Sequence, residues 1–273
     1  SEVPEDNYPR LLNLLESSDA FTAKSSVESD LFLKFIIGNI HRRLGNWNTA
    51  IKIQEHLLNL SGRLGEFETQ NKMLLELVIL MRRTGNYERA LGILRRLSTI
   101  SSIEDEMYAR TQIEHARICV DRGNADGAKG LLESIHPELL TLEVIMLFAE
   151  VELLDKRFSK ARSYIEKGFE LAGNSRKELA QLHIILAQIF TQQINPERAL
   201  QEYETALNYL NDIHDIIQMA RVWMNMGSLY ISLEDWASAE KFLRKALRVL
   251  HASGDRLAEQ VARRNLQLIS DNV

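Results

Sequence analysis

Residues 221–247 carry apolar and polar positions with the period of two consecutive α-helices. Two sets of apolar or small residues recur at helical spacing: Trp223, Met226, Gly227 and Tyr230, and then Trp236, Ala239, Leu243 and Ala246. The polar-rich residues 232–235 separate the two sets and predict a short turn. We therefore expect an antiparallel helix hairpin, which needs neighbouring hairpins to bury its outer faces.

The same pattern occurs six times along the chain, at intervals of 33 to 40 residues. A small residue after each predicted turn marks the copies: Ala50, Ala90, Ala128, Ala161, Ala199 and Ala239. A second position, twelve residues earlier, is also mostly small: Gly38, Val78, Ala116, Ala149, Ala187 and Gly227. Small residues let one helix backbone approach another closely, so the pattern predicts a stack of helix hairpins.

This pattern resembles the tetratricopeptide repeat (TPR) family, whose repeats read Trp-x2-Leu-Gly-x2-Tyr, followed in the second helix by Ala, a Phe-like residue and Ala. The sixth copy matches best, with Met226 in the place of Leu. The fourth copy departs most, because Glu152 stands where an aromatic residue is usual and Gly168 where Ala is usual. Most copies are longer than the usual length of about 34 residues. The resemblance implies an all-α fold: a right-handed superhelical α-solenoid of about six TPR-like hairpins, with N- and C-terminal capping helices.

We expect three segments: an N-terminal helix (8–15) and linker over 1–26, the solenoid over 27–253, and a capping helix with a polar outer face over 254–273. The expected repeats cover residues 28–61, 66–100, 104–136, 137–172, 176–211 and 214–252. A Gly-Asn pair recurs in three predicted turns, at residues 45–46, 85–86 and 123–124. Glycine suits the left-handed conformation that ends a helix, and asparagine suits the cap of the next one. Pro137 suits the first turn of a helix and is expected to open the fourth repeat.

Composition is that of a soluble globular protein, with 45% hydrophobic and 26% charged residues. The net charge of −5 argues against a general nucleic-acid binder. The single Cys119 excludes an internal disulfide and is expected to be a buried thiol. No signal peptide and no run of 18 apolar residues occurs, so we expect a cytoplasmic protein without a membrane span. The chain begins without Met, which is consistent with an excerpt of a longer chain or a processed chain.

Enzyme motifs are absent from the sequence. The seven histidines have no zinc-site spacing, and neither a glycine-rich nucleotide loop nor a Gly-x-Ser-x-Gly motif occurs. We therefore predict no enzyme activity, no catalytic residue, no metal and no cofactor.

In the TPR family the first helix of each repeat faces a concave groove. The resemblance assigns ten partner-binding residues to this groove: Phe35, Asn39, Arg42, Arg43, Lys72, Ile79, Arg82, Arg83, Arg110 and Arg117. Most are cations, and Asn39 with Arg43 resembles part of the Asn/Lys/Arg set with which some TPR proteins clamp a peptide carboxylate. An acidic or C-terminal peptide is therefore one expected ligand. The alternative is that the arginine pairs simply favour the helix C-terminal dipole, by about 0.3–1 kcal/mol each.

Apolar residues take the same groove positions in the later repeats: Met146, Leu153, Ile184 and Met224. They suit either a surface for an amphipathic helix or core packing. The predicted function is a protein–protein interaction scaffold or adaptor that binds a peptide or amphipathic helix of another protein. The alternative is an effector-sensing or regulatory domain of a larger signalling or transcription-regulator protein.

Overall fold

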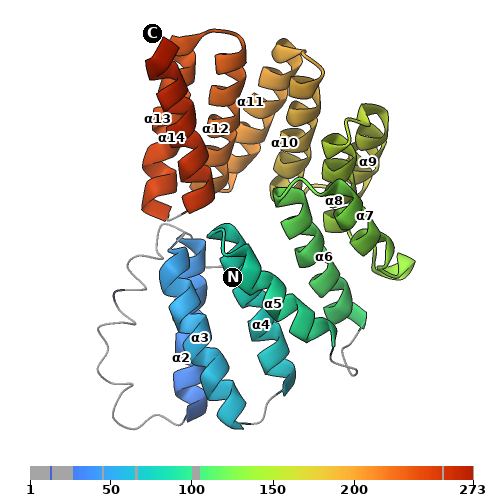
Figure 1. Cartoon of the computed structure of the whole chain (residues 1–273), viewed down its shortest axis with the longest axis vertical. Coiled ribbons are helices and arrows are strands. Elements are labelled where there is room, and N and C mark those ends of the chain that lie inside the picture. The colour runs from blue at the N-terminus through green and yellow to red at the C-terminus, as the bar shows by residue number, and fades with distance from the viewer. Residues whose placement is uncertain are drawn as a thin grey trace. The chain divides into compact units, whose positions relative to one another are not determined.

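The computed structural model describes Asn13 and residues 27–44, 46–64, 67–99, 105–253 and 255–272. In this part of the chain, thirteen α-helices follow one another, with one short 3-10 turn between α7 and α8 (Figure 1). They are α2 (Val27–Arg43), α3 (Trp47–Leu64), α4 (Phe67–Arg83), α5 (Tyr87–Ser98), α6 (Asp105–Asp121), α7 (Ala125–Glu133), η3 (Pro137–Leu139), α8 (Leu142–Leu154), α9 (Phe158–Ala172), α10 (Arg176–Gln192), α11 (Pro196–Asp212), α12 (Ile216–Ser232), α13 (Trp236–Ser253) and α14 (Arg256–Asn272).

The predicted all-α repeat fold is confirmed, since no strand occurs among the described residues and the helices follow one another in pairs. The six pairs run from α2–α3 to α12–α13, and α14 follows the last of them. The expected helix at 8–15 lies outside the described residues, apart from Asn13, which is helical. The assignment of the chain to a linker, one solenoid and a terminal cap stays a prediction.

Contacts within the chain divide it into two units: Ser1–Ile100 with His251–Leu257, and Ser101–Leu250 with Ala258–Val273. In the first unit α2 packs against α3, α3 against α4, and α4 against α5. In the second unit the same order of contacts runs from α6 to α12, and the first helices of neighbouring pairs also touch, as α6 with α8 and α8 with α10. Each unit is therefore a stack of hairpins whose core lies between the helices.

The small residues of the sequence pattern lie where helices cross. All six alanines that follow the turns are buried, as are the six residues twelve positions earlier. Gly227 shows why: a Cβ there would lie 2.6 Å from Leu243 Cγ of the paired helix. The repeats are also tied by polar contacts, since the buried Tyr203 of α11 hydrogen-bonds Thr191 of α10 and Asn225 of α12. Burial raises the pKa of Tyr203 to about 12, although both hydrogen bonds act to lower it.

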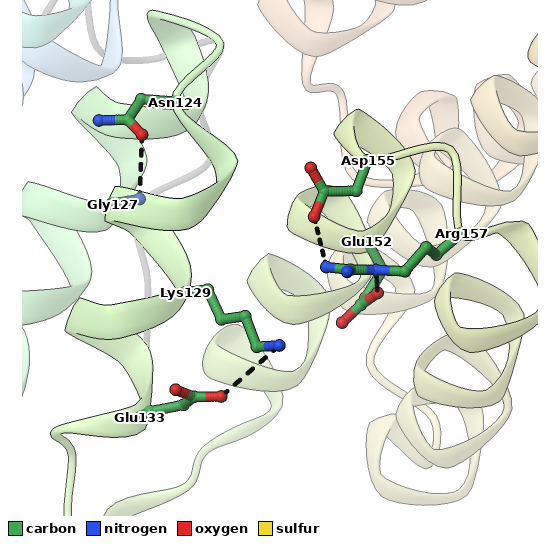
Figure 2. Close-up of polar contacts among 7 residues, drawn as sticks. All are labelled: Asn124, Gly127, Lys129, Glu133, Glu152, Asp155 and Arg157. Carbon is green, nitrogen blue, oxygen red and sulfur yellow. Dashed lines mark hydrogen bonds and ion pairs between the residues drawn. The ribbon is translucent and has the colours of Figure 1, made fainter.

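The turns within the hairpins use a left-handed residue, as expected at Gly85 (φ 76°) and Gly123 (φ 73°). Three later hairpins place non-glycine residues in the same conformation: Lys156, Ile194 and Glu234. The expected asparagine cap is present at Asn124, whose Oδ1 accepts from the Gly127 N–H at 2.9 Å (Figure 2). Asn86 makes no such cap, because its amide donates to Thr84 Oγ1 at 2.9 Å instead.

The start of the fourth repeat differs from the prediction. Pro137 opens only the three-residue turn η3, and α8 begins five residues later at Leu142. The backbone of Leu140 is extended (φ −73°, ψ 93°), which separates the turn from the helix. Proline favours the first turn of any helical segment, so it cannot by itself distinguish a 3-10 turn from an α-helix.

Candidate functional site

The first helices of the pairs carry the residues that were expected to bind a partner. Within each unit, we call the solvent-exposed side of these first helices the A face: that of α2 and α4 in the first unit, and that of α6, α8, α10 and α12 in the second. Eight of the ten predicted residues belong to α2 and α4 in the first unit, and Arg110 and Arg117 belong to α6 in the second. The ten residues are therefore described in two sets, one for each unit.

In the first unit, Phe35 and Lys72 are exposed, whereas Asn39, Arg42, Ile79 and Arg83 are half-buried. Arg42 Nε lies 3.9 Å from Glu76 Oε2, and this ion pair connects α2 to α4. The distance is too long for a hydrogen bond, and an exposed ion pair of this kind contributes only about 0–1 kcal/mol. Glu76 nevertheless reduces the positive charge that Arg42 presents on the A face.

Arg82 was expected to be a groove cation, but its side chain is only 8% exposed. The reason is its register, because Arg82 lies one helical turn after Val78, the small residue that packs at the helix crossing. The same position in α8 is Leu153, which is also buried. Residues four after the small position therefore lie at the edge of the core, and Arg82 is not an exposed contact residue.

In the second unit, Arg117 is engaged in ion pairs. Its Nη2 donates to Glu143 Oε1 at 2.7 Å, and its Nε lies 3.6 Å from Glu114 Oε1. The side chain is 25% exposed. Burial alone would lower the pKa of Arg117, but the carboxylates of Glu114, Glu150 and Glu143 raise it above its ordinary value. Three carboxylates around one guanidinium make this part of the A face acidic.

Arg110, about two helical turns from Arg117 towards the helix start, is more exposed. Its Nε lies 3.8 Å from Glu106 Oε1 on the same helix. Arg42, Arg110 and Arg117 each form an ion pair with an acidic residue of a first helix. Glu106 and Glu114 lie on the same helix as their partners, whereas Glu76 and Glu143 come from the next first helix. Counting charges along one helix therefore overestimates the basic character of the face.

The apolar groove residues of the later repeats divide between core and surface. Met146 and Leu153 are buried, so core packing accounts for both. Ile184 and Met224 are partly buried against the core of the second unit. Helix α14 carries exposed apolar residues at the corresponding positions, and the sequence reasoning missed them because it treated α14 only as a polar cap.

The fourth hairpin contains a buried carboxylate in place of the usual aromatic residue. Glu152 is buried and accepts a hydrogen bond from Arg157 Nε, while Arg157 Nη2 donates to Asp155 (Figure 2). Arg157 precedes α9, at the position where asparagine or aspartate precedes the second helix of every other pair. The hydrogen bond to Glu152 is the largest cause that raises the pKa of Arg157. The two unusual residues therefore compensate for each other within one hairpin.

Groups that could support catalysis or hold a metal are sparse among the described residues. No cluster of three or more His, Cys, Asp or Glu side chains there is arranged to bind a metal ion. Cys119 is half-buried, and burial raises the pKa of its thiol although Arg122 opposes the shift. A raised pKa leaves less reactive thiolate at neutral pH. Across the part of the chain that the structure describes, no helix combines the length and apolar character that a membrane span requires.

The comparisons with known proteins agree with the helix pattern. The family model described as "Tetratricopeptide repeat" matches residues 220–249, which cover most of α12 and α13. The chain is a helical-repeat protein, and its residues 220–249 match the tetratricopeptide repeat. No curated protein is recognisably similar in sequence to this chain.

Solved structures share the fold of the chain at low sequence identity. A tetratricopeptide repeat protein from Parabacteroides merdae superposes with a TM-score of 0.58 at 12% identity, over 95% of this chain and 91% of that one. A Rap protein complexed with competence and sporulation factor gives a TM-score of 0.57 at 15% identity, over 85% of this chain and 69% of that one. A signal transduction ATPase with numerous domains from Pyrococcus horikoshii, which has a tetratricopeptide repeat sensor, gives 0.55 at 14% identity. The match covers 97% of this chain and 43% of that protein. At such identities the likeness is one of fold alone.

Proposed function

We propose that the protein is a non-catalytic interaction scaffold or adaptor, which binds a peptide or amphipathic helix of another protein along the A face. The observation that carries this proposal is the lateral contact of successive first helices. Arg42–Glu76 connects α2 to α4, and Arg117–Glu143 connects α6 to α8. Helices that adjoin in this way present one continuous surface within each unit, and repeat proteins use such surfaces to bind extended partners.

An acidic or C-terminal segment is the proposed ligand of the first three repeats. In the first unit, Asn39, Arg42, Lys72 and Arg83 offer hydrogen-bond donors beside the apolar Phe35 and Ile79. Charge-assisted hydrogen bonds to carboxylates would supply affinity there, and the apolar side chains would supply contact area. Arg43 belongs to this proposed set by sequence position. In the second unit, Arg110 and Arg117 are the proposed residues of the third repeat, and Arg117 is already paired with Glu143.

The test is affinity capture with the 273-residue chain, followed by mass spectrometry and titration of the captured segment. The variant Arg42→Glu/Lys72→Glu should reduce capture at least tenfold. A matched control is Arg95→Glu/Arg96→Glu, which makes the same charge change at two exposed positions on the second helix α5. Unchanged capture by the first variant, or binding indifferent to about 0.5 M salt, would contradict an ionic A-face contact.

A second function has support from two of the structural neighbours. The chain would be an effector-sensing or regulatory domain of a larger signalling or transcription-regulator protein. One neighbour carries a tetratricopeptide repeat sensor, and another was solved in complex with competence and sporulation factor. The two functions differ in what the full-length gene encodes. A DNA-binding or ATPase segment joined to this chain would favour regulation, and a full-length product that contains only repeats would favour an adaptor.

A further inference from the structure

Helix α14 has the length and position of a first helix in a seventh repeat. It begins 40 residues after α12, and this offset places Arg263, Gln267 and Ser270 where α12 has Trp223, Gly227 and Tyr230. In α12 these three residues pack towards α13. In α14 all three replacements are polar and exposed. This side of α14 is therefore suited to water, as expected for the cap of a repeat stack.

The A-face side of α14 is different, because it exposes two large apolar residues. Val261 is 46% exposed and Leu268 is 45% exposed. They are seven residues apart, so they lie on the same side of the helix, about 10 Å from each other along its axis. Their counterparts in α12 are the polar residues Arg221 and Ser228. Helix α14 is thus polar on the side that only faces water, but it exposes apolar residues on its A-face side.

These residues continue the A face of α12. Asn265 Nδ2, between Val261 and Leu268 on α14, donates to Ser228 Oγ of α12 at 2.8 Å. Met224 and Ile231 lie one turn before and one turn after Ser228, and both are only partly buried. We call Met224, Ile231, Val261, Arg264 and Leu268 the C-terminal patch.

Charge at the C-terminal patch is positive. Arg264 is exposed between the two apolar residues and makes no ion pair with any described residue. Helix α12 contributes Arg221 and has no acidic residue over its whole length. On α14, Glu259 pairs with Arg263, and Asp271 accepts a hydrogen bond from Gln267 Nε2 at 2.8 Å. A ligand with carboxylates beside its apolar residues complements this arrangement.

We propose that the C-terminal patch is the docking site for an acidic amphipathic helix of a partner protein. The inference rests on the proposed scaffold function and names its ligand in the last repeats. Apolar ligand residues at positions i and i+7 match the spacing of Val261 and Leu268, and a glutamate or aspartate between them meets Arg264. This ligand differs from the one proposed for the first repeats, because apolar burial rather than ion pairing supplies most of its affinity.

The experiment uses the 273-residue chain and three synthetic 18-residue helical peptides with a fluorescent label. One has a leucine stripe and glutamates, one has the same stripe with lysines, and one has the acidic composition in scrambled order. Fluorescence anisotropy should show binding of the first peptide at least tenfold tighter than of either other peptide. Equal affinity for the acidic and basic peptides, or for the acidic and scrambled peptides, would overturn the proposal.

Two variants test the patch itself. We expect binding of the acidic peptide to weaken by about tenfold or more in Val261→Ser/Leu268→Ser, and also in Arg264→Glu. The matched control Arg248→Glu reverses an exposed charge on α13 and should leave the affinity within twofold. Circular dichroism checks that each variant is folded. Affinity unchanged by Val261→Ser/Leu268→Ser would overturn the patch as the binding site.

Three further results separate this inference from the function on which it rests and from binding of a second copy. Partner capture that survives Val261→Ser/Leu268→Ser but is lost in Arg42→Glu/Lys72→Glu would overturn the patch and leave the scaffold function standing. No partner captured by the unmodified chain, and no peptide bound, would contradict both. Light scattering could instead show that the unmodified chain is a dimer and that Val261→Ser/Leu268→Ser is a monomer. That result would show that the patch binds a second copy of the chain, and it would overturn the proposal of a partner helix.

Discussion

Gly227 offers the sharpest test of the reason why the repeats need small residues. An alanine Cβ at this position of α12 would lie 2.6 Å from Leu243 Cγ and 2.9 Å from Leu243 Cδ2, with the Ala239 carbonyl oxygen at 3.4 Å. Carbon atoms in contact prefer a separation of about 3.5–4.0 Å, so the two helices must separate by roughly 1 Å or Leu243 must leave its rotamer. Leu243 is fully buried, and its Cγ is a branch point rather than a flexible end.

Two free-energy terms oppose each other in Gly227→Ala. Overpacking a core by one methyl group costs about 1–3 kcal/mol. Replacing glycine inside a helix gains about 1 kcal/mol of helix propensity. We therefore expect the free energy of unfolding to fall by about 1 kcal/mol, and by more for Gly227→Val. Guanidinium unfolding followed by circular dichroism at 222 nm measures the change.

Gly130 is the matched control, because it lies in helix α7 of the same unit and a Cβ there would meet nothing within 4 Å. Gly130→Ala therefore receives only the helix-propensity gain and should raise the free energy of unfolding by about 0.5–1 kcal/mol. The two substitutions are chemically identical, so opposite signs would isolate the packing term. An increase in stability for Gly227→Ala would refute the close-approach reasoning.

Three other predictions concern single features of the second unit. Ile194 holds a left-handed backbone (φ 58°) with 90% of its surface exposed. Ile194→Gly should therefore raise the free energy of unfolding by about 0.5–1 kcal/mol, once the entropy cost of glycine is counted, and so raise the denaturant midpoint. Burial raises the pKa of Asp215 above its ordinary 3.8, so ionising this carboxyl destabilises the folded protein. The free energy of unfolding is therefore highest below pH 3.8 and falls as the pH rises through the raised pKa. Asp215→Asn keeps the cap to the Gln218 N–H and should stabilise the protein at pH 7 but not at pH 3. Arg157→Ala leaves the buried Glu152 carboxylate without its guanidinium and should lower the melting temperature, which Glu152→Phe in the same chain should largely restore.

Each of these predictions has a control that tests its stated cause. Ile194→Val retains the β-branched side chain, so it should leave the midpoint unchanged, and an equal gain for valine would contradict the backbone argument. Equal stabilisation by Asp215→Asn at pH 3 and pH 7 would show that burial of the charge is not the cause. For the ion pair, a double-mutant cycle with Glu152→Phe alone measures the coupling, and additive effects would mean that the two residues do not compensate.

The helices were predictable because their packing requirement repeats along the sequence. A residue such as Gly227 or Ala199 must be small wherever two helices cross, and six such crossings leave six small residues at near-regular intervals. The start of α8 was not predictable in the same way. Pro137 fits the first turn of either kind of helix, and only the extended backbone at Leu140 shows that the turn ends before α8 begins.

The candidate contact residues were predictable by position but not by environment. Arg82 has the expected place on α4, yet it lies on the same stripe as the buried Val78. Glu76 and Glu143 reduce the charge of Arg42 and Arg117, and both acids come from the neighbouring repeat, 34 and 26 residues later in the chain. Such pairs depend on how successive first helices adjoin, which the sequence of one helix does not contain.

The ion pairs of Arg117 also bear on where a ligand gains affinity. An anionic ligand that approaches this guanidinium must compete with Glu143 at 2.7 Å and with the nearby carboxylates of Glu114 and Glu150. Replacing one carboxylate by another gains little free energy, and separating a partly buried pair costs desolvation. Arg264 has no such competitor among the described residues, and the apolar residues beside it lose unfavourable water contact on binding. Within the second unit, affinity for an acidic helix should therefore come from the α12 and α14 end of the A face, while Arg117 chiefly holds α6 against α8.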